Sequence, residues 1–126
     1  MTFLESPTIH TLVQIAIGCV WIFHGLYSKV LNGIPRHRQI VERVLGKNVG
    51  QFATKVIGVL EVLLGLWVFS GWERVSCAGV QTLAIAGMNT LEIIFAADLL
   101  ISAVGMLFLN VGFLTLVWLW AISVPK

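Results

Sequence analysis

Four long apolar runs constrain the fold of this chain more than any other feature of its sequence. They cover about residues 9–27, 52–70, 75–95 and 99–124. A helix needs roughly 20 apolar residues to cross about 30 Å of hydrocarbon, and each run is close to or above that length. The four runs and their connections use almost all of the 126 residues. We therefore expect an all-α membrane protein with a single transmembrane domain over residues 1–126.

The composition supports the same class of protein. Apolar residues make up 58% of the chain, only 11% of its residues are charged, and the mean hydropathy is +0.94. An ordinary soluble domain is about 25% charged. The first partner expected is therefore the lipid bilayer, and no partner among the nucleic acids is expected.

The basic residues are concentrated between the first two runs. Five of the eight are Lys29, Arg36, Arg38, Arg43 and Lys47. Because cytoplasmic loops of membrane proteins carry an excess of lysine and arginine, this loop is predicted to be cytoplasmic and both termini to lie on the outer side, as in a bacterial inner-membrane protein. Trp72, Trp118 and Trp120 lie near the predicted outer ends of spans, where an aromatic belt is expected.

Within the basic loop, the sequence predicts a short amphipathic helix. Pro35 suits its first turn, Gly46 is placed to end it, and apolar residues recur at helical spacing between them. Its cations would face lipid headgroups, and we assign that role to Arg36, Arg38, Arg43 and Lys47. The alternative is a plain basic loop that only sets the topology.

Glycines recur at a spacing of seven residues, which is close to two helical turns. The pairs are Gly18 and Gly25, Gly58 and Gly65, and Gly105 and Gly112, and the third span follows more loosely with Gly79 and Gly87. Small residues on one face allow helix backbones to approach closely in a membrane. We therefore expect a compact antiparallel bundle of four transmembrane helices with these glycines inside it.

Polar residues inside the spans form a candidate intramembrane site, since ionisable groups there are costly and usually have a role. Counted from the cytoplasmic side, the layers contain Lys29 and Glu92, then His24 and Asn89, then Glu61 and Asn110. This layering predicts an ion pair between Lys29 and Glu92. His24 and Asn89 would then continue a polar chain toward Glu61.

Glu61 shares a helix face with Gly58 and Gly65, so it is predicted to point into the bundle. There it either pairs with a cation or stays protonated. Two roles remain open. Glu61 and His24 form a relay that exchanges protons with a substrate, or Glu61 is hydrogen-bonded to His24, Asn110 or a backbone group and fixes the helix register.

No cofactor or metal ligand set is apparent in the sequence. A haem with two histidine ligands needs imidazoles that face each other inside the membrane, and His10 and His37 are not placed to face His24. Cys19 and Cys77 form no CxxC motif and are predicted to be unbridged packing residues. We therefore predict no metal and no catalytic residue, and a quinone is the one cofactor that we keep open.

Two segments resemble the DoxX-like family of small four-helix membrane proteins. In WIFHGLYSKVL the matching residues are Trp21, Gly25 and Lys29, and in GVLEVLLGLW they are Gly58, Glu61 and Gly65. The family often has a Pro-Phe-x-Pro stretch before an asparagine that opens the last span, and here only Asn110 matches. The connection over residues 96–109 is therefore predicted either as loop and helix or as partly re-entrant.

The resemblance implies the fold more than a reaction. Relatives include subunits linked to quinone-dependent sulfur oxidation and terminal oxidases, maturation proteins, and a chaperone for receptor assembly. Our first hypothesis is an accessory, assembly or scaffold component that binds another membrane protein or a second copy of itself. The second is a quinone-linked oxidoreductase subunit with its site near His24, Glu61 and Glu92. The third is transport of a small solute or proton by an oligomer.

Overall fold

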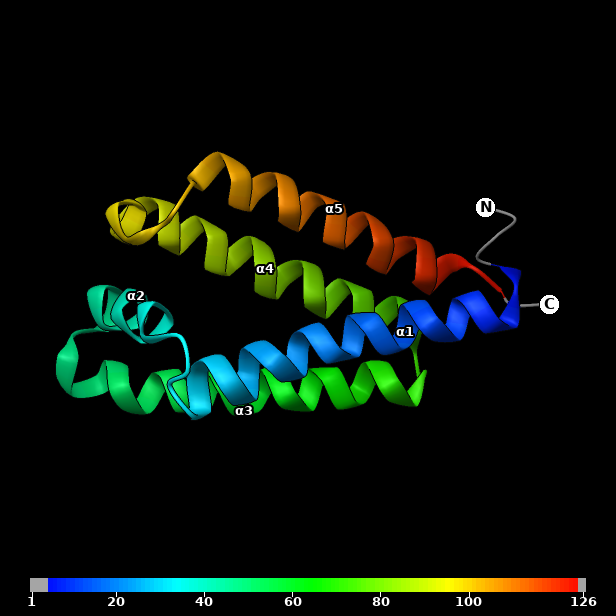
Figure 1. Cartoon of the computed structure of the whole chain (residues 1–126), viewed down its shortest axis with the longest axis horizontal. Coiled ribbons are helices and arrows are strands. Elements are labelled where there is room, and N and C mark those ends of the chain that lie inside the picture. Colours follow the sequence, from blue (N-terminus) through cyan, green and yellow to red (C-terminus); the bar gives the residue numbers. More distant parts are fainter. Residues whose placement is uncertain (1–4, 125–126) are drawn as a thin grey trace.

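The computed structural model describes residues 5–124, and every regular element in that range is a helix. In Figure 1 the chain forms a long bundle with one short helix at one end. The elements in chain order are α1 (Pro7–Ile22), the π-helix η2 (Phe23–Val30), α2 (Pro35–Leu45), α3 (Lys47–Ser70), α4 (Arg74–Ala96), the 3-10 turn η3 (Ala97–Leu99) and α5 (Ala103–Ile122).

Four of the helical segments are long and apolar enough to cross a membrane, as the sequence predicts. They cover Pro7–Val30, Lys47–Ser70, Arg74–Leu99 and Ala103–Ile122. The first two begin before the predicted 9–27 and 52–70, because helical structure continues past the apolar runs into polar flanks.

The last span begins later than the predicted residue 99. Ser102 caps α5 there, since its hydroxyl oxygen accepts a hydrogen bond from the Gly105 N–H at 3.0 Å. Residues 96–109 therefore contain the end of α4, the turn η3, a short connection and the first two turns of α5. The segment is built of loop and helix, and its partial re-entry into the membrane stays a prediction.

The helices are arranged as two antiparallel pairs. Helix α1 with η2 packs along α3, and α4 packs along α5 (Figure 1). The start of α1 lies beside the end of α5, where the His10 ring nitrogen Nε2 is 3.0 Å from the Trp120 carbonyl oxygen. Helix α2 lies at the opposite end, against α3 and α4. The antiparallel four-helix bundle is confirmed.

Glycines bring α1 and α3 into backbone contact, as predicted for the first two spans. A Cβ atom added to Gly58 would lie 2.6 Å from the carbonyl oxygen of Gly25, and one added to Gly65 would lie 2.9 Å from that of Gly18. Atoms at such distances overlap, and a backbone oxygen cannot move aside by changing a rotamer. These four glycines therefore set the spacing of the two helices.

The same prediction is wrong for the last two spans. An added Cβ would have no neighbour within 4 Å at Gly79, Gly87 or Gly112, and at Gly105 it would meet only Ser102 of its own turn. Helices α4 and α5 instead meet through larger side chains, such as Trp118, whose indole N–H donates to the Thr82 hydroxyl. Their glycines consequently lie on open faces.

Large side chains fill the core where the four spans meet. Ile17, Val68, Val117 and Trp120 are fully buried and belong to one apolar cluster. Trp120 is therefore a core residue, and its expected place in an aromatic belt is wrong, whereas Trp72 is 68% exposed at the predicted outer end.

Candidate functional site

The first span ends in a π-helix, and this segment carries His24 and Lys29 of the candidate site. Helix η2 covers Phe23–Val30, and its hydrogen bonds run on to Leu31, whose N–H donates to the Leu26 carbonyl at 2.9 Å. π-Helical turns are rare and often lie at functional sites. Within η2, Ser28 and Lys29 are buried.

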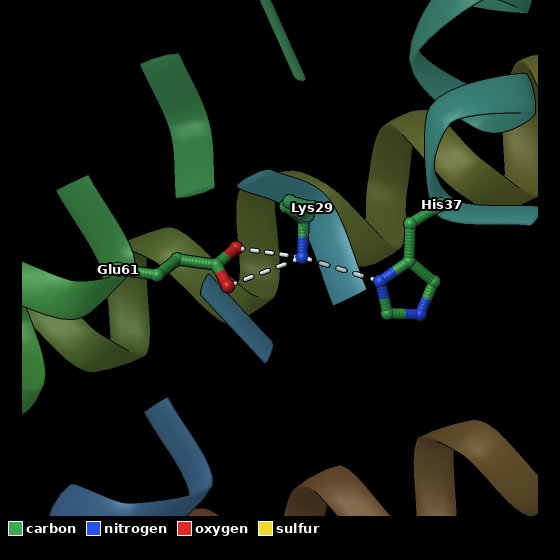
Figure 2. Close-up of polar contacts among 3 residues, drawn as sticks. All are labelled: Lys29, His37 and Glu61. Carbon is green, nitrogen blue, oxygen red and sulfur yellow. Dashed lines mark hydrogen bonds and ion pairs between the residues drawn. The ribbon is translucent and has the colours of Figure 1, made fainter. Parts of the chain in front are cut away.

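Lys29 and Glu61 form a buried ion pair between η2 and α3. The Lys29 ammonium nitrogen is 2.9 Å from Glu61 Oε1 and 3.1 Å from Oε2 (Figure 2). The two residues are 9% and 5% exposed. The contact between Gly25 and Gly58, one turn from each charge, holds the backbones close enough for this pair. Each charge is thereby compensated inside the span.

The predicted partner of Lys29 is corrected by this geometry, because Lys29 pairs with Glu61 and not with Glu92. Element η2 packs against α3, where the glycines allow the closest approach, whereas Glu92 lies on α4. Glu92 is partly buried, and among residues 5–124 it forms no ion pair within 4.0 Å. The depth of each residue along its helix could be counted from the sequence. Which helix lies beside η2 could not be predicted in that way.

A histidine from α2 completes the cluster around Lys29. His37 Nδ1 lies 3.4 Å from the Lys29 ammonium, on the side opposite Glu61 (Figure 2). Burial, followed by the positive charges of Lys29 and other neighbours, lowers the pKa of His37 to about 3. The imidazole is therefore neutral at neutral pH, so Nδ1 can accept a hydrogen bond from the ammonium group.

His24 stacks on His37 and does not contact Glu61. The two imidazole rings are 5.6 Å apart between centroids, with 18° between their planes. Among the described residues, the charged or hydrogen-bonding partner of Glu61 is Lys29 and not His24 or Asn110. Within residues 5–124, His24 and Glu61 do not make the direct contact that a two-residue proton relay needs. The histidine stack was missed by sequence reasoning, because periodicity does not show that α2 folds back over η2.

Asn89 and Asn110 form a second polar feature, separate from the Lys29 contacts. The Asn110 side-chain amide donates to the Asn89 carbonyl oxygen at 2.9 Å and joins α4 to α5. Both residues line a groove of about 300 Å³ between these helices, together with Ile85, Ala86, Thr90, Ile93, Leu107, Val111 and Leu114. The predicted site thus divides into an ion-pair cluster on η2 and α3 and an amide pair on α4 and α5.

Two of the four cations assigned to lipid headgroups have partners within the protein. Arg43 forms two hydrogen bonds with the Asp98 carboxylate, at 2.7 and 3.1 Å, which join α2 to the end of the third span and raise the pKa of Arg43. Arg38 Nε lies 3.3 Å from the Glu42 carboxylate on the same helix. The contact of all four cations with headgroups stays a prediction, as does the amphipathic role of α2.

The remaining reactive side chains do not form a ligand set. Within residues 5–124 there is no group of three His, Cys, Asp or Glu side chains that could hold a metal ion. Cys77 is a buried free thiol, as expected of a packing residue, but Cys19 is exposed, so its predicted packing role is wrong. The chemistry that the cluster offers is charge compensation and hydrogen bonding rather than nucleophilic attack.

The comparisons with known proteins agree with the resemblance seen in the sequence. Residues 18–118 match the family model described as the DoxX-like family. The match includes η2, α2, α3 and α4 and most of α5, and so contains both polar features. Comparison with curated proteins and with solved structures gave no match.

Proposed function

The chain belongs to the DoxX-like family of membrane proteins, and from this premise we propose that it is a non-catalytic accessory component that holds or assembles a membrane protein complex. The observation that carries this proposal is the open face of α4 and α5. The Asn89 and Asn110 side chains line a groove between these two helices, with apolar side chains around them. Such a face suits docking by another transmembrane helix.

Exposed apolar side chains would not support this proposal by themselves, because lipid tails are as apolar as leucine. The two amides are more informative. Asparagine forms hydrogen bonds between helices, and lipid tails offer no partner for them. The groove beside Asn89 and Asn110 therefore favours a protein partner over lipid alone.

The ion-pair cluster fits a structural role in this proposal. Lys29 and Glu61 compensate each other, and His37 from α2 supports the lysine from the other side. An ion pair that joins two helices and a loop helix fixes their register, which is one established use of buried polar groups. A rigid α1–α3 half would then present the α4–α5 face to a partner.

We also place the protein in the bacterial inner membrane, with the basic loop in the cytoplasm and both termini outside. The support is the concentration of cations on α2 and at the start of α3, together with the common end shared by the start of α1 and the end of α5.

Site-directed photo-crosslinking in native membranes tests the proposed function. A photoreactive residue at Val111, in the α5 groove, is expected to form adducts with a protein. The same residue at Leu60, which is 58% exposed on α3, is the matched control and is expected to react with lipid only. Equal lipid labelling at both positions, with no protein adduct, would overturn the proposal.

A quinone-linked oxidoreductase subunit is the second candidate. Its support is the gathering of His24, Lys29, His37 and Glu61 at one level of the bundle, where polar groups could orient a quinone ring. A quinone titration of the wild type and of Glu61→Gln distinguishes the candidates. Tight binding that Glu61→Gln abolishes would favour this second function, and negligible binding in both proteins would remove it. Transport of a small solute or proton by an oligomer is a weaker candidate.

A further inference from the structure

We propose that a second copy of this chain docks on the α4–α5 face, in a two-fold dimer in which Asn89 and Asn110 of one copy bond to the same residues of the other. This inference rests on the proposed function, because it names the partner for the face described there. Three features of the groove support it: the unused capacity of the amides, their self-complementarity, and the length of the groove.

The asparagine pair keeps unused hydrogen-bonding capacity. One bond joins Asn110 Nδ2 to Asn89 Oδ1, which leaves the Asn89 NH₂ group and the Asn110 carbonyl oxygen. Within residues 5–124 neither side chain has a further partner. Exchanging N and O in both amides would leave the same count, one NH₂ group and one carbonyl oxygen. Such groups are costly in hydrocarbon, so a partner that bonds them is favoured.

The unused groups are self-complementary. A two-fold interface brings the same patch of both copies together, so a patch must offer a donor and a matching acceptor. The NH₂ group of one copy can bond the carbonyl oxygen of the other, and the reverse bond follows by symmetry. Copies inserted with one topology also bring their asparagines to the same membrane depth.

The shape of the face suits a helix better than a compact ligand. A second groove, along α5, shares Val111 and Leu114 with the first and continues to Ile122. From Leu107 to Ile122 the combined groove follows about 22 Å of helix axis, at about 1.5 Å per residue. Its lining residues include no charged side chain. A long, shallow and uncharged groove fits the α5 helix of a second copy.

Disulfide trapping provides the first test. Thr115 lines the α5 groove, and Leu63 is 55% exposed on α3 as the matched control. Both are changed to cysteine in a Cys19→Ala background, because Cys19 is exposed, whereas the buried Cys77 is kept. Mild oxidation in native membranes is expected to give a disulfide-linked dimer from Thr115→Cys and not from Leu63→Cys.

The second test measures the dimer in detergent. The full-length protein is expected to have twice the chain mass, and the Asn89→Ala, Asn110→Ala double variant should raise the dimer dissociation constant about tenfold, since interhelical hydrogen bonds are individually modest. Leu63→Ala should leave it unchanged. Circular dichroism of each variant shows whether the helices still form, so that a misfolded variant is not counted.

Each contrary outcome has a defined meaning. A monomer in detergent that gives no Thr115→Cys dimer, but cross-links at Val111 to a different protein, would overturn this inference and leave the proposed function standing. A monomer that carries a lipid-soluble molecule in native mass spectrometry, released by the asparagine changes, would overturn it in favour of a ligand groove. The absence of any protein adduct at Val111 would overturn both proposals.

Discussion

The two helix pairs of this protein use the same residue type in opposite ways. Between α1 and α3, glycines lie in backbone contact and flank a buried ion pair. On α4 and α5, glycines lie open and an amide pair lines a groove. The share of buried residues follows the same division. In the apolar 18-residue window of each span, it is 28% for the first two spans and 17% for the last two. One half is packed against itself, and the other leaves its small residues free.

This difference shows why glycine spacing alone does not predict packing within a chain. A glycine face permits close approach, but the partner can be a helix of the same chain or of another molecule. For α1 and α3 the partner lies within the chain. For α4 and α5 the described residues provide none. The docking proposal rests on the amide pair and on the groove beside it.

The largest loss of stability is expected when one charge of the buried pair in the α1–α3 half is removed. Glu61→Met leaves Lys29 without its counter-charge and is expected to reduce the free energy of unfolding by about 3–5 kcal/mol. The Lys29→Met, Glu61→Met double variant should recover most of that loss, because neither charge remains. Reversible unfolding in mixed micelles measures both. A double variant no more stable than Glu61→Met would show that the ion pair is not the cause.

Adding one methyl group to each half separates closed glycines from open ones. Gly58→Ala would press against the Gly25 carbonyl oxygen, and we expect a loss of about 1–3 kcal/mol in the free energy of unfolding. Gly87→Ala meets nothing within 4 Å and should be neutral or stabilising by less than about 1 kcal/mol, since alanine favours helix. Equal losses in the two variants would contradict the division into two halves.

A lower pH is expected to reduce the free energy of unfolding through His37, which contacts Lys29 of the buried pair. Its pKa is lowered from 6.5 to about 3 in the folded protein, so between these values the unfolded chain binds a proton that the folded chain does not. The free energy of unfolding should therefore fall as pH decreases below 6.5, by less than about 1 kcal/mol per pH unit because the ring is partly exposed to screening solvent.

The readout for His37 is the difference between the wild type and His37→Gln, because other groups also titrate in this range. Lys29, His24 and Arg36 are the positive or titratable groups that act on His37, and all remain in the variant. The pH dependence of unfolding should be shallower in His37→Gln. If the free energy of unfolding has the same pH dependence in both proteins, protonation of His37 does not contribute to the loss of stability.

The smallest effect is expected at the clamp between α2 and the end of the third span. Arg43→Met removes its two hydrogen bonds to Asp98, but both side chains are exposed to solvent. Exposed ion pairs contribute little to stability. We expect an unchanged unfolding midpoint with faster hydrogen exchange in α2. If the α2 amides exchange as slowly in Arg43→Met as in the wild type, the packing of Ile40, and not the Arg43–Asp98 contact, holds this helix in place.

Much of the fold could be predicted because its determinants are local. The four apolar runs predict four spans. The short helix begins at Pro35 and ends before Gly46, whose φ of 90° suits glycine. The position of Glu61 on the Gly58 face also predicts its inward direction. Each of these inferences needs only the period of one helix.

The contacts between helices could not be predicted in the same way. Lys29 and Glu92 share a depth, but the rotation and neighbours of each helix decide which charges meet, and Lys29 meets Glu61. The π-helical turn shifts the register of η2, and the return of α2 brings His37 onto His24. The pairing of Asn89 with Asn110 likewise depends on how α4 lies against α5.

The central claim is that the α1–α3 half faces lipid while the α4–α5 groove is covered by protein. Spin labels at Leu63 and Thr115, each in a Cys19→Ala background, test it directly in native membranes through their accessibility to molecular oxygen, which concentrates in lipid. The account predicts high accessibility at Leu63 and much lower accessibility at Thr115. Equal, high accessibility at both positions would contradict it.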